Sequence, residues 1–507
     1  MSKTYSTLWL ATTLTLVSAA SMALEIVAGR ALAPYVGMSL YTWTVIIAVV
    51  LAGLSLGHWI GGGLADRSQR PGRWVFGTLL GAALTSGVSL LALRWMEPLA
   101  VGTNPVSHVS LLALAAFFLP SLMAGVISPL LTKMALDGTA PDHHGRIIGR
   151  MFALGAAGAI LGTLFAGLVL ISWVGTTGSV LLITVTYLML AISFFGDWRA
   201  WFVFVPLGFV LVKGDEGALA SLGGGACTLE SAYFCIRVDS IQMLGRDAKV
   251  MALDHLAHGV NDREDPLLLL SPYVHGVDEL LRHRGVEGPA AFFIGGGAYT
   301  LPRAWVARWP AAQLVMAEVD PDVTRLAREE LWLGSPANLT VIHRDARVAL
   351  QDLPADAHFD VIFGDAFHDI SVPQHLVTDE FHAQLAARLT PGGVYAMNVV
   401  DKLREPLFVL SLAQTLGRQF SHVELWLDLQ AIRPTEARTT WIVLASDTPT
   451  RTGEVTSTYG FERKWVQVPV AQMVDTVGAD RLVTLTDDYA PVDRLLGDLL
   501  LSGELLE

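Results

Sequence analysis

The chain has 507 residues, which is too long for a single hydrophobic core, so at least two domains are expected. A mean hydropathy of +0.48 and a charged fraction of 16% lie outside the range of ordinary soluble proteins. The net charge of −13 argues against a nucleic-acid partner, because phosphate binding needs a basic surface, and two cysteines are too few for a thiolate metal site.

Residues 1–213 carry few charges and several long apolar runs. A helix needs about 20 apolar residues to cross a bilayer. A seventh, shorter run at 200–212 contains Pro206, and it could span, re-enter or lie at the interface. We therefore predict a transmembrane helical domain over 1–213 with six to seven helices and the lipid bilayer as partner. The six long stretches are 7–33, 40–62, 74–94, 106–132, 147–172 and 177–196.

The basic residues of this half fall in alternate loops, and cytoplasmic loops are the ones enriched in Lys and Arg. The pattern predicts a multi-pass protein of the cell (inner) membrane with a cytoplasmic N-terminus. If residues 200–213 cross the membrane, the following domain is external; if they do not, it is cytoplasmic. The basic residues are Lys3, Arg67, Arg70, Arg73, Lys133, Arg146, Arg150 and Arg199 on one side, against Arg94 and Arg30.

Glu25 and Arg30 lie in the first apolar stretch. Charges inside a membrane usually face a cavity or a partner, so both are candidate functional residues. The alternatives are a structural ion pair or an arginine that extends to the interface. Residues 61–67 resemble the loop between helices 2 and 3 of major-facilitator transporters, which keeps a transporter with a ligand-sensing soluble domain as an alternative function. Gly155, Gly158 and Gly162 predict a close helix contact.

The second half reads as α/β. Residues 214–225 form a predicted linker, and 226–285 a small β-domain with a connecting helix that begins with a hairpin of Ala226–Glu230 and Tyr233–Asp239. Over 286–507 strands alternate with helices, which predicts a Rossmann-like parallel sheet.

Five strands are predicted in this last region, and functional residue types gather at their carboxyl ends. The first strand runs into Gly295, Gly296 and Gly297, and the next three are followed by Glu318, Asp345 and Asp365. Ligands bind at these ends of a parallel sheet, and an acid after the second strand can hold ribose hydroxyls. The pattern predicts a nucleoside site, unless the acids are helix N-caps. The strands are 291–294, 314–317, 339–343, 359–363 and 393–399.

Several stretches in this order resemble the spermidine synthase (polyamine aminopropyltransferase) family, which has a class I methyltransferase-like fold, and the apolar half resembles the helices of its membrane-fused members. The resemblance covers about residues 230–400. The stretches are Glu230-Ser231-Ala232-Tyr233, Leu253-Asp254, Gly295-Gly296-Gly297, Ala317-Glu318-Val319-Asp320, Arg344-Asp345-Ala346, Gly364-Asp365-Ala366 and Thr378-Asp379-Glu380-Phe381.

The resemblance implies a transferase with decarboxylated S-adenosylmethionine or a related nucleoside as donor. Glu318 would hold the ribose, Asp345 the adenine amino group, and Asp365 would deprotonate an attacking amine. Tyr233 and Asp254 would also bind ligand.

The sequence departs from the family where a polyamine would be held. Ala298 stands where the family has an aspartate that binds the donor's amine. Phe234 and His258 replace glutamines, and His255 replaces a glycine. His368 replaces the second aspartate of the loop after strand four.

The replacements form their own group of candidate catalytic residues. His258 is followed by Asp262 and Glu264, and His368 and Asp369 follow Asp365; in the family fold these segments face each other across one pocket. Carboxylates beside imidazoles suit proton transfer near neutral pH. They could instead be metal ligands or hydrogen-bonded surface residues, but no HxH or HExxH spacing supports a metal, and none is predicted.

Cys227 and Cys235 lie on the two arms of the predicted hairpin, where a disulfide and two free thiols are both possible. A disulfide would indicate an oxidising compartment. A cytoplasmic domain would suit an aminopropyltransferase acting on a small-molecule amine. An external domain would suit a diverged enzyme that keeps the pocket without a nucleoside donor and acts on an exported peptide or small molecule, for example in N-terminal glutamine cyclisation. A homodimer is possible.

Overall fold

A computed structural model describes residues 5–100, 103–195, 227–367, 370–430, 438–497 and 499. They form two compact units, a helical unit (Met1–Cys235) and an α/β unit (Ile236–Glu507). The predicted linker and the seventh apolar run lie outside the described residues.

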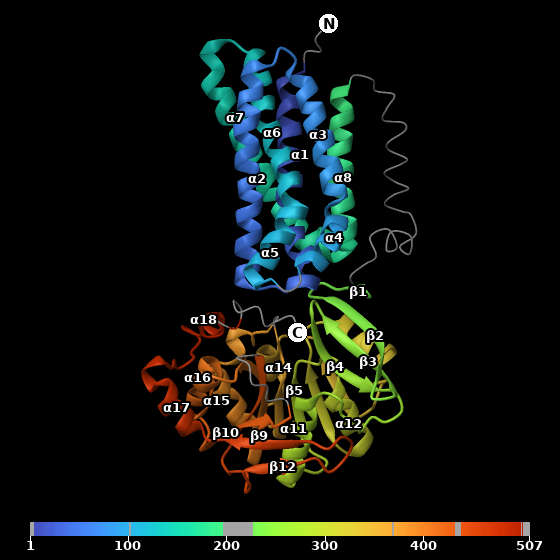
Figure 1. The fold of residues 1–507 in the computed structure, drawn as a ribbon, viewed down its shortest axis with the longest axis vertical. Coiled ribbons are helices and arrows are strands. Elements are labelled where there is room, and N and C mark those ends of the chain that lie inside the picture. The colour runs from blue at the N-terminus through green and yellow to red at the C-terminus, as the bar shows by residue number, and fades with distance from the viewer. Residues whose placement is uncertain are drawn as a thin grey trace. The chain divides into compact units, whose positions relative to one another are not determined.

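The helical unit consists of long apolar helices that run back and forth (Figure 1). Four helical stretches in the described residues are long and apolar enough to cross a membrane, and the pair α3 and α4, bent by 52°, makes up to five. One of them, Pro141–Phe194, has 54 residues, or about 80 Å, which exceeds one crossing. It is broken at Gly175, where φ is +67°. The helices are α1 (Thr7–Val36), α2 (Leu40–Arg67), α3 (Pro71–Gly87), α4 (Ser89–Ala100), α5 (Pro105–Ala113), α6 (Leu119–Asp137), α7 (His144–Phe165) and α8 (Ile171–Phe195).

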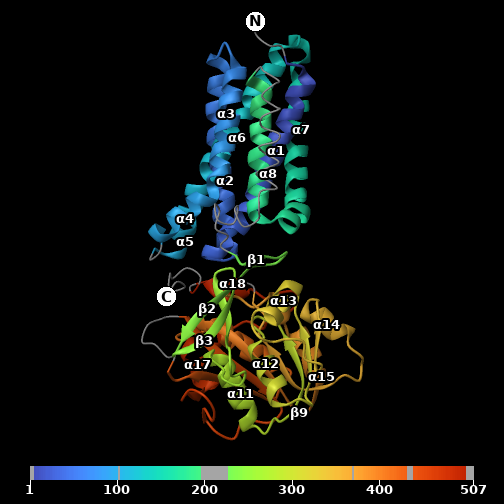
Figure 2. The ribbon, with the colours of Figure 1, turned by 90° about the vertical axis from the view of Figure 1, so that its right-hand side faces the viewer.

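Close packing of α7 on α1 depends on the predicted glycine face (Figure 2). A Cβ atom at Gly158 would lie 2.2 Å from the carbonyl oxygen of Thr15, and one at Gly162 would lie 2.1 Å from that of Ala19. Only glycine allows the two backbones to approach so closely. The contacts also show that α7 runs parallel to α1, because higher numbers in one helix meet higher numbers in the other.

The α/β unit begins with a small antiparallel sheet. β2 (Cys235–Met243) pairs with β3 (Arg246–Leu253), and β3 pairs with β4 (Leu256–Asp262). A short strand, β1 (Leu229–Glu230), precedes them in the helical unit. The predicted hairpin region is therefore strand-rich, with a longer second arm than expected.

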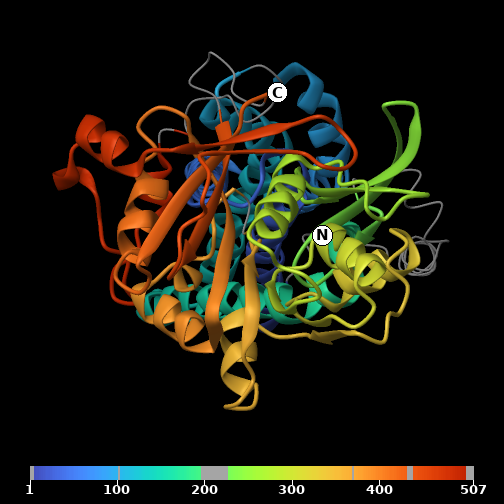
Figure 3. The same ribbon diagram turned by 90° about the horizontal axis from the view of Figure 1, so that it is seen from below.

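The main sheet has nine strands in the order β12-β13-β10-β11-β9-β8-β5-β6-β7. The five neighbouring strands β9, β8, β5, β6 and β7 are parallel to one another, and the other four strands pair antiparallel. Figure 3 shows helices on both faces of this twisted sheet. The order and the parallel core confirm the predicted Rossmann-like fold. The strands are β5 (Ala290–Ile294), β6 (Gln313–Ala317), β7 (Leu339–Ile342), β8 (Phe359–Gly364), β9 (Leu389–Lys402), β10 (His422–Asp428), β11 (Arg438–Ser446), β12 (Glu454–Thr456) and β13 (Lys464–Val468).

All five predicted strands are present. β5, β6, β8 and β9 carry buried apolar side chains on both faces, as in a parallel sheet covered by helices, whereas the edge strand β7 is only partly buried. The helices that follow β5, β6 and β7 begin within a few residues of the strand ends. Eight α-helices belong to the described part of this unit. They are α11 (Pro272–His283), α12 (Thr300–Arg308), α13 (Pro321–Glu329), α14 (Ala346–Asp352), α15 (Asp379–Arg388), α16 (Leu407–Leu416), α17 (Val470–Val477) and α18 (Val492–Leu495).

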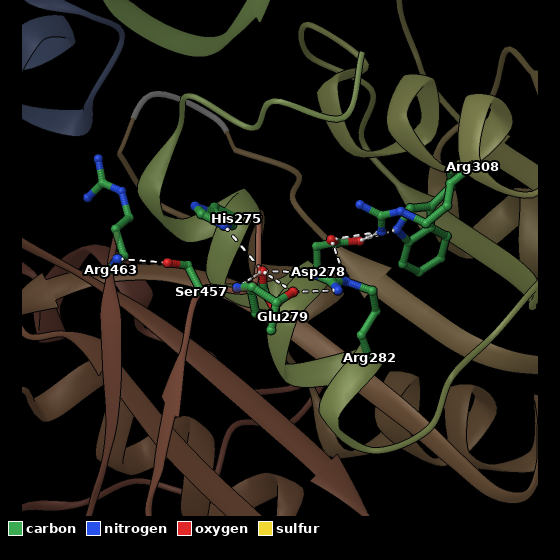
Figure 4. A network of polar contacts seen from close by, with 9 residues as sticks. His275, Asp278, Glu279, Arg282, Arg308, Ser457 and Arg463 are labelled. Atoms are coloured by element: carbon green, nitrogen blue, oxygen red, sulfur yellow. Dashed lines mark hydrogen bonds and ion pairs between the residues drawn. The ribbon is translucent and has the colours of Figure 1, made fainter. Parts of the chain in front are cut away.

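A buried polar network fixes α11 to its neighbours (Figure 4). Asp278 accepts hydrogen bonds from Trp305 Nε1 at 2.8 Å, Arg308 Nη1 at 2.7 Å and Arg282 Nε at 3.1 Å. Next to it, Glu279 accepts from the backbone N–H of Thr458 at 2.8 Å. A buried carboxylate is tolerated only when such donors surround it. The network thus holds α11, which also carries Tyr273.

Candidate active site at the carboxyl ends of the strands

The glycine-rich turn after β5 brings two backbone segments into contact. Gly295 and Gly297 have φ values of +87° and +48°, a region that glycine enters without steric cost. A Cβ at Gly295 would lie 2.7 Å from the carbonyl oxygen of Asp365. The turn therefore lies directly against the loop that follows β8.

Asp365 is held by two donors from different elements. Its Oδ2 accepts a hydrogen bond from Tyr273 Oη of α11 at 3.0 Å, and its Oδ1 accepts one from Asn398 Nδ2 of β9 at 2.8 Å. Burial raises the pKa of Asp365 to about 7, although both hydrogen bonds favour the carboxylate. The Oδ1 atom of Asn398 is buried without a hydrogen-bond partner among the described residues.

Sequence reasoning missed Tyr273 and Asn398. Asn398 interrupts an otherwise apolar buried strand at the edge where the acids gather, which was a usable signal. Tyr273 stands on a helix that no motif connected with the sheet.

Asp365 lines a small pocket at the carboxyl ends of the strands. Four predicted residues line it together, from the glycine turn, β4 and the loop after β8. Apolar side chains supply most of the remaining wall. The lining residues are His258, Tyr273, Val274, Phe293, Gly295, Gly296, Thr300, Leu301, Pro302, Phe363 and Asp365.

His258 enters the pocket from β4. Burial, assisted by the positive charge of Arg438, lowers its pKa to about 4. The imidazole is thus neutral at pH 7, and the expected titration near neutral pH belongs to Asp365 instead. His368 and Asp369 lie outside the described residues.

Asp262 and Glu264 do not line this pocket. Asp262 forms a two-point ion pair with Arg246, at 2.6 Å from Nε and 2.9 Å from Nη2, which lowers the pKa of its carboxyl. It also accepts from the backbone N–H groups of Glu264 and Asp265. The Glu264 side chain is 83% exposed. The Asp262 carboxylate therefore fixes the backbone that follows β4. The geometry does not support the predicted role of Asp262 and Glu264 in the pocket.

Glu318 and Asp345 follow β6 and β7 as predicted. Glu318 is buried, and its oxygens accept from the backbone N–H groups of Gly296 at 2.7 Å and Asp320 at 2.8 Å. Asp345 caps α14 through the N–H of Arg347 at 3.0 Å, and its other oxygen lies 2.7 Å from His375 Nε2. The alternative reading of Asp345 as an N-cap is thus correct, and the hydrogen bond from His375 lowers the pKa of its carboxyl.

These residues fit a nucleoside by their hydrogen-bonding capacity. Each carboxylate oxygen can accept two hydrogen bonds, so Glu318 retains acceptor sites for ribose hydroxyls beside the glycine turn. Asp345 is half-buried and retains acceptor capacity for an amino group. Ala298 is buried and offers no acid for an amine on the ligand.

The remaining predicted residues lie elsewhere. Asp254 is buried in the turn between β3 and β4, with φ of +54°. Tyr233 is exposed and belongs to the helical unit, where its carbonyl accepts from Arg30 at 2.5 Å. Glu25 is buried in α1, and its Oε2 has no hydrogen-bond partner among the described residues. Arg30 pairs with Glu230, not with Glu25 as the ion-pair alternative would require.

No group of three or more His, Cys, Asp or Glu side chains that could hold a metal occurs in the described part of the chain.

Comparison with known proteins finds relatives named as polyamine aminopropyltransferases. A probable polyamine aminopropyl transferase of Bifidobacterium longum is 32% identical over 112 residues, 22% of this chain and 24% of that protein. A polyamine aminopropyltransferase of Vibrio vulnificus is 32% identical over 107 residues, 21% of this chain and 36% of that protein. The resemblance to the spermidine synthase family is confirmed. These relatives are transferases, and the matches span about a quarter and a third of their length. No family model matches the chain.

Solved structures that resemble the chain include two of spermidine synthases. A probable spermidine synthase from Corynebacterium glutamicum has a TM-score of 0.43 and 20% identity, covering 51% of this chain and 95% of that one. A spermidine synthase in complex with the transition state analogue AdoDATO has a TM-score of 0.33 and 19% identity, covering 42% and 71%.

Proposed function

We propose that the chain is a membrane-anchored, spermidine synthase-like transferase in which Asp365 deprotonates an amine nucleophile. The observation that supports it most is the environment of Asp365. The carboxyl lies in a pocket at the end of β8 that includes several apolar side chains, and its pKa is about 7. A general base works best when its pKa is close to the working pH.

The residues around Asp365 suit proton transfer from a bound ammonium group. A free alkylamine is protonated at neutral pH, with a pKa of about 10 for a lysine-like amine, and must lose a proton before it can attack. Tyr273 and Asn398 each occupy one oxygen of the carboxylate, fix its plane and leave lone pairs for the amine. Phe293 and Phe363 line the pocket and restrict access of water.

The glycine turn, Glu318 and Asp345 would hold the nucleoside of the donor. Bound decarboxylated S-adenosylmethionine would supply an aminopropyl carbon activated by its sulfonium. Calorimetry on the detergent-solubilised full chain tests this part with decarboxylated S-adenosylmethionine and methylthioadenosine. We expect saturable binding that Glu318→Gln weakens about 10-fold or more, because hydrogen bonds to a charged group are lost. No binding of either compound would overturn the assignment of the donor.

A second candidate keeps the same base but has no nucleoside donor and acts on an exported peptide or small molecule. One observation favours it: Ala298, a buried alanine that follows the glycine turn, offers no acid for the amine of a donor. In this case Asp365→Asn abolishes activity on the identified substrate, while methylthioadenosine neither binds nor inhibits.

A further inference from the structure

One end of the helical unit is defined by the start of the chain. Tyr5 Oη donates to the carbonyl oxygen of Phe194 at 3.4 Å, and the two rings are 4.7 Å apart. A Cβ at Gly72 would lie 3.6 Å from the Tyr5 ring and 3.9 Å from Met134. The N-terminus, the start of α3 and the ends of α6 and α8 therefore share one end, here called the Tyr5 end.

The opposite end is defined by the segment that follows residue 226. Glu230 Oε2 accepts from the backbone N–H of Thr176 at 2.7 Å, and Glu230 Oε1 accepts from the hydroxyl of Thr176. Arg30 donates to the carbonyl oxygens of Ser231 at 2.9 Å and Tyr233 at 2.5 Å. The carboxylate thus caps the part of α8 that begins after the break, where the helix dipole favours negative charge. These contacts are called the Glu230 clasp.

The two ends are separated by the length of α8. From Thr176 to Phe194 the helix rises about 27 Å, close to the roughly 30 Å of a bilayer's hydrocarbon core. Phe195, the last residue of α8, therefore lies at the Tyr5 end, and the next described residue, Cys227, lies at the Glu230 clasp.

Basic residues mark the Tyr5 end. α7 starts there, since it runs parallel to α1, and so do α3 and the loop after α6. Of the eight Lys and Arg residues in 5–195, six lie at that end and two at the other. Cytoplasmic ends carry such an excess. The six are Arg67, Arg70, Arg73, Lys133, Arg146 and Arg150; the two are Arg30 and Arg94.

A separate observation concerns the Glu230 clasp itself. Cys227 and Cys235 form a disulfide that closes the clasp segment. Structural disulfides persist in oxidising compartments and are rare in the cytosol. The charge distribution and the disulfide are independent, and both assign the clasp to the side away from the cytoplasm.

We infer that the α/β unit lies on the non-cytoplasmic side of the membrane. It starts at Ile236, directly after Cys235, so its chain emerges at the Glu230 clasp. One consequence rests on the proposed function. If the chain transfers a group to an amine, that amine is present outside the cytoplasm. It is supplied by export or by release from an exported chain, and a nucleoside donor would need to cross the membrane as well.

The experiment uses the full chain in cells with reporters at two positions. Alkaline phosphatase, which folds only outside the cytoplasm, and a green fluorescent protein that fluoresces only inside are each fused after Glu507. The matched control carries the same reporters at Thr139, in the loop at the Tyr5 end. In parallel, a maleimide of high mass is applied to denatured protein with and without prior reduction.

We expect phosphatase activity without fluorescence at Glu507, the reverse at Thr139, and labelling of both cysteines only after reduction. Fluorescence at Glu507, or two cysteines that label without reduction, would overturn the inference. The topology result does not depend on catalysis. Asp365→Asn can abolish activity whether the α/β unit lies outside or inside the cytoplasm. Failure of the inference and failure of the proposed function are thereby distinguished.

Discussion

Removing the hydroxyl that contacts Asp365 tests the proposed base most sharply. In Tyr273→Phe the carboxylate loses the hydrogen bond at 3.0 Å, while the ring still fills its place. A hydrogen bond to a charged group is worth about 1.5–3 kcal/mol, and about 1.4 kcal/mol corresponds to one pH unit. Asp365 is partly exposed, so the lower end of this range applies. We expect its pKa to rise from about 7 by about one unit.

Infrared spectroscopy measures this titration without a known substrate. The difference between spectra of the wild type and Asp365→Asn isolates the carboxyl band, which is followed from pH 4 to 10. Tyr459→Phe is the matched control, since Tyr459 Oη donates to an exposed carboxylate, Asp265, and its loss should leave the band unchanged. A wild-type midpoint near 4, or no upward shift in Tyr273→Phe, would refute the reasoning.

Three further outcomes concern stability of the detergent-solubilised chain, followed by thermal unfolding. Asp278→Asn removes the charge that Arg282 and Arg308 neutralise, and we expect a loss of about 3–5 kcal/mol. Asp322→Asn, whose carboxylate is 35% exposed and pairs with Arg325, should cost below about 1 kcal/mol. Leucine at Gly162 should separate α7 from α1 and lower the midpoint, whereas leucine at Gly149, where a Cβ meets nothing within 4 Å, should not. Buried acids with pKa values near 7 bind protons in the folded state that the unfolded state has released, so stability should fall from pH 5 to 8, and a rise would contradict this. These acids are Glu318, Asp365 and Asp401.

The sequence was informative where burial imposes a pattern. Short apolar runs ended by Gly or an acid predicted five strands within about three residues of their observed limits, except that β9 begins earlier, at Leu389. The strand-end positions of Glu318, Asp345 and Asp365 followed directly, because parallel strands align their carboxyl ends at one edge. Glycines at helical spacing predicted the close contact of α7 with another helix, because glycine is required only where two helix backbones touch.

The sequence was less informative where side chains from distant elements meet. Tyr273 lies 92 residues from Asp365, and only the packing of α11 brings them together. Asp262 appeared to belong to the pocket, but a long-range pair with Arg246 engages it. Glu230 belongs to a motif of the resembling family, yet its carboxylate caps a broken helix of the helical unit, a contact that no local pattern encodes.

The most direct test of the central claim compares transfer by the wild type and by Asp365→Asn. The purified full chain is incubated with decarboxylated S-adenosylmethionine and a panel of amines, and products are identified by mass spectrometry. We predict an aminopropylated amine whose rate of formation falls at least about 100-fold in Asp365→Asn, with nucleoside binding retained. A product formed equally fast by the variant would contradict the assignment of Asp365 as the base.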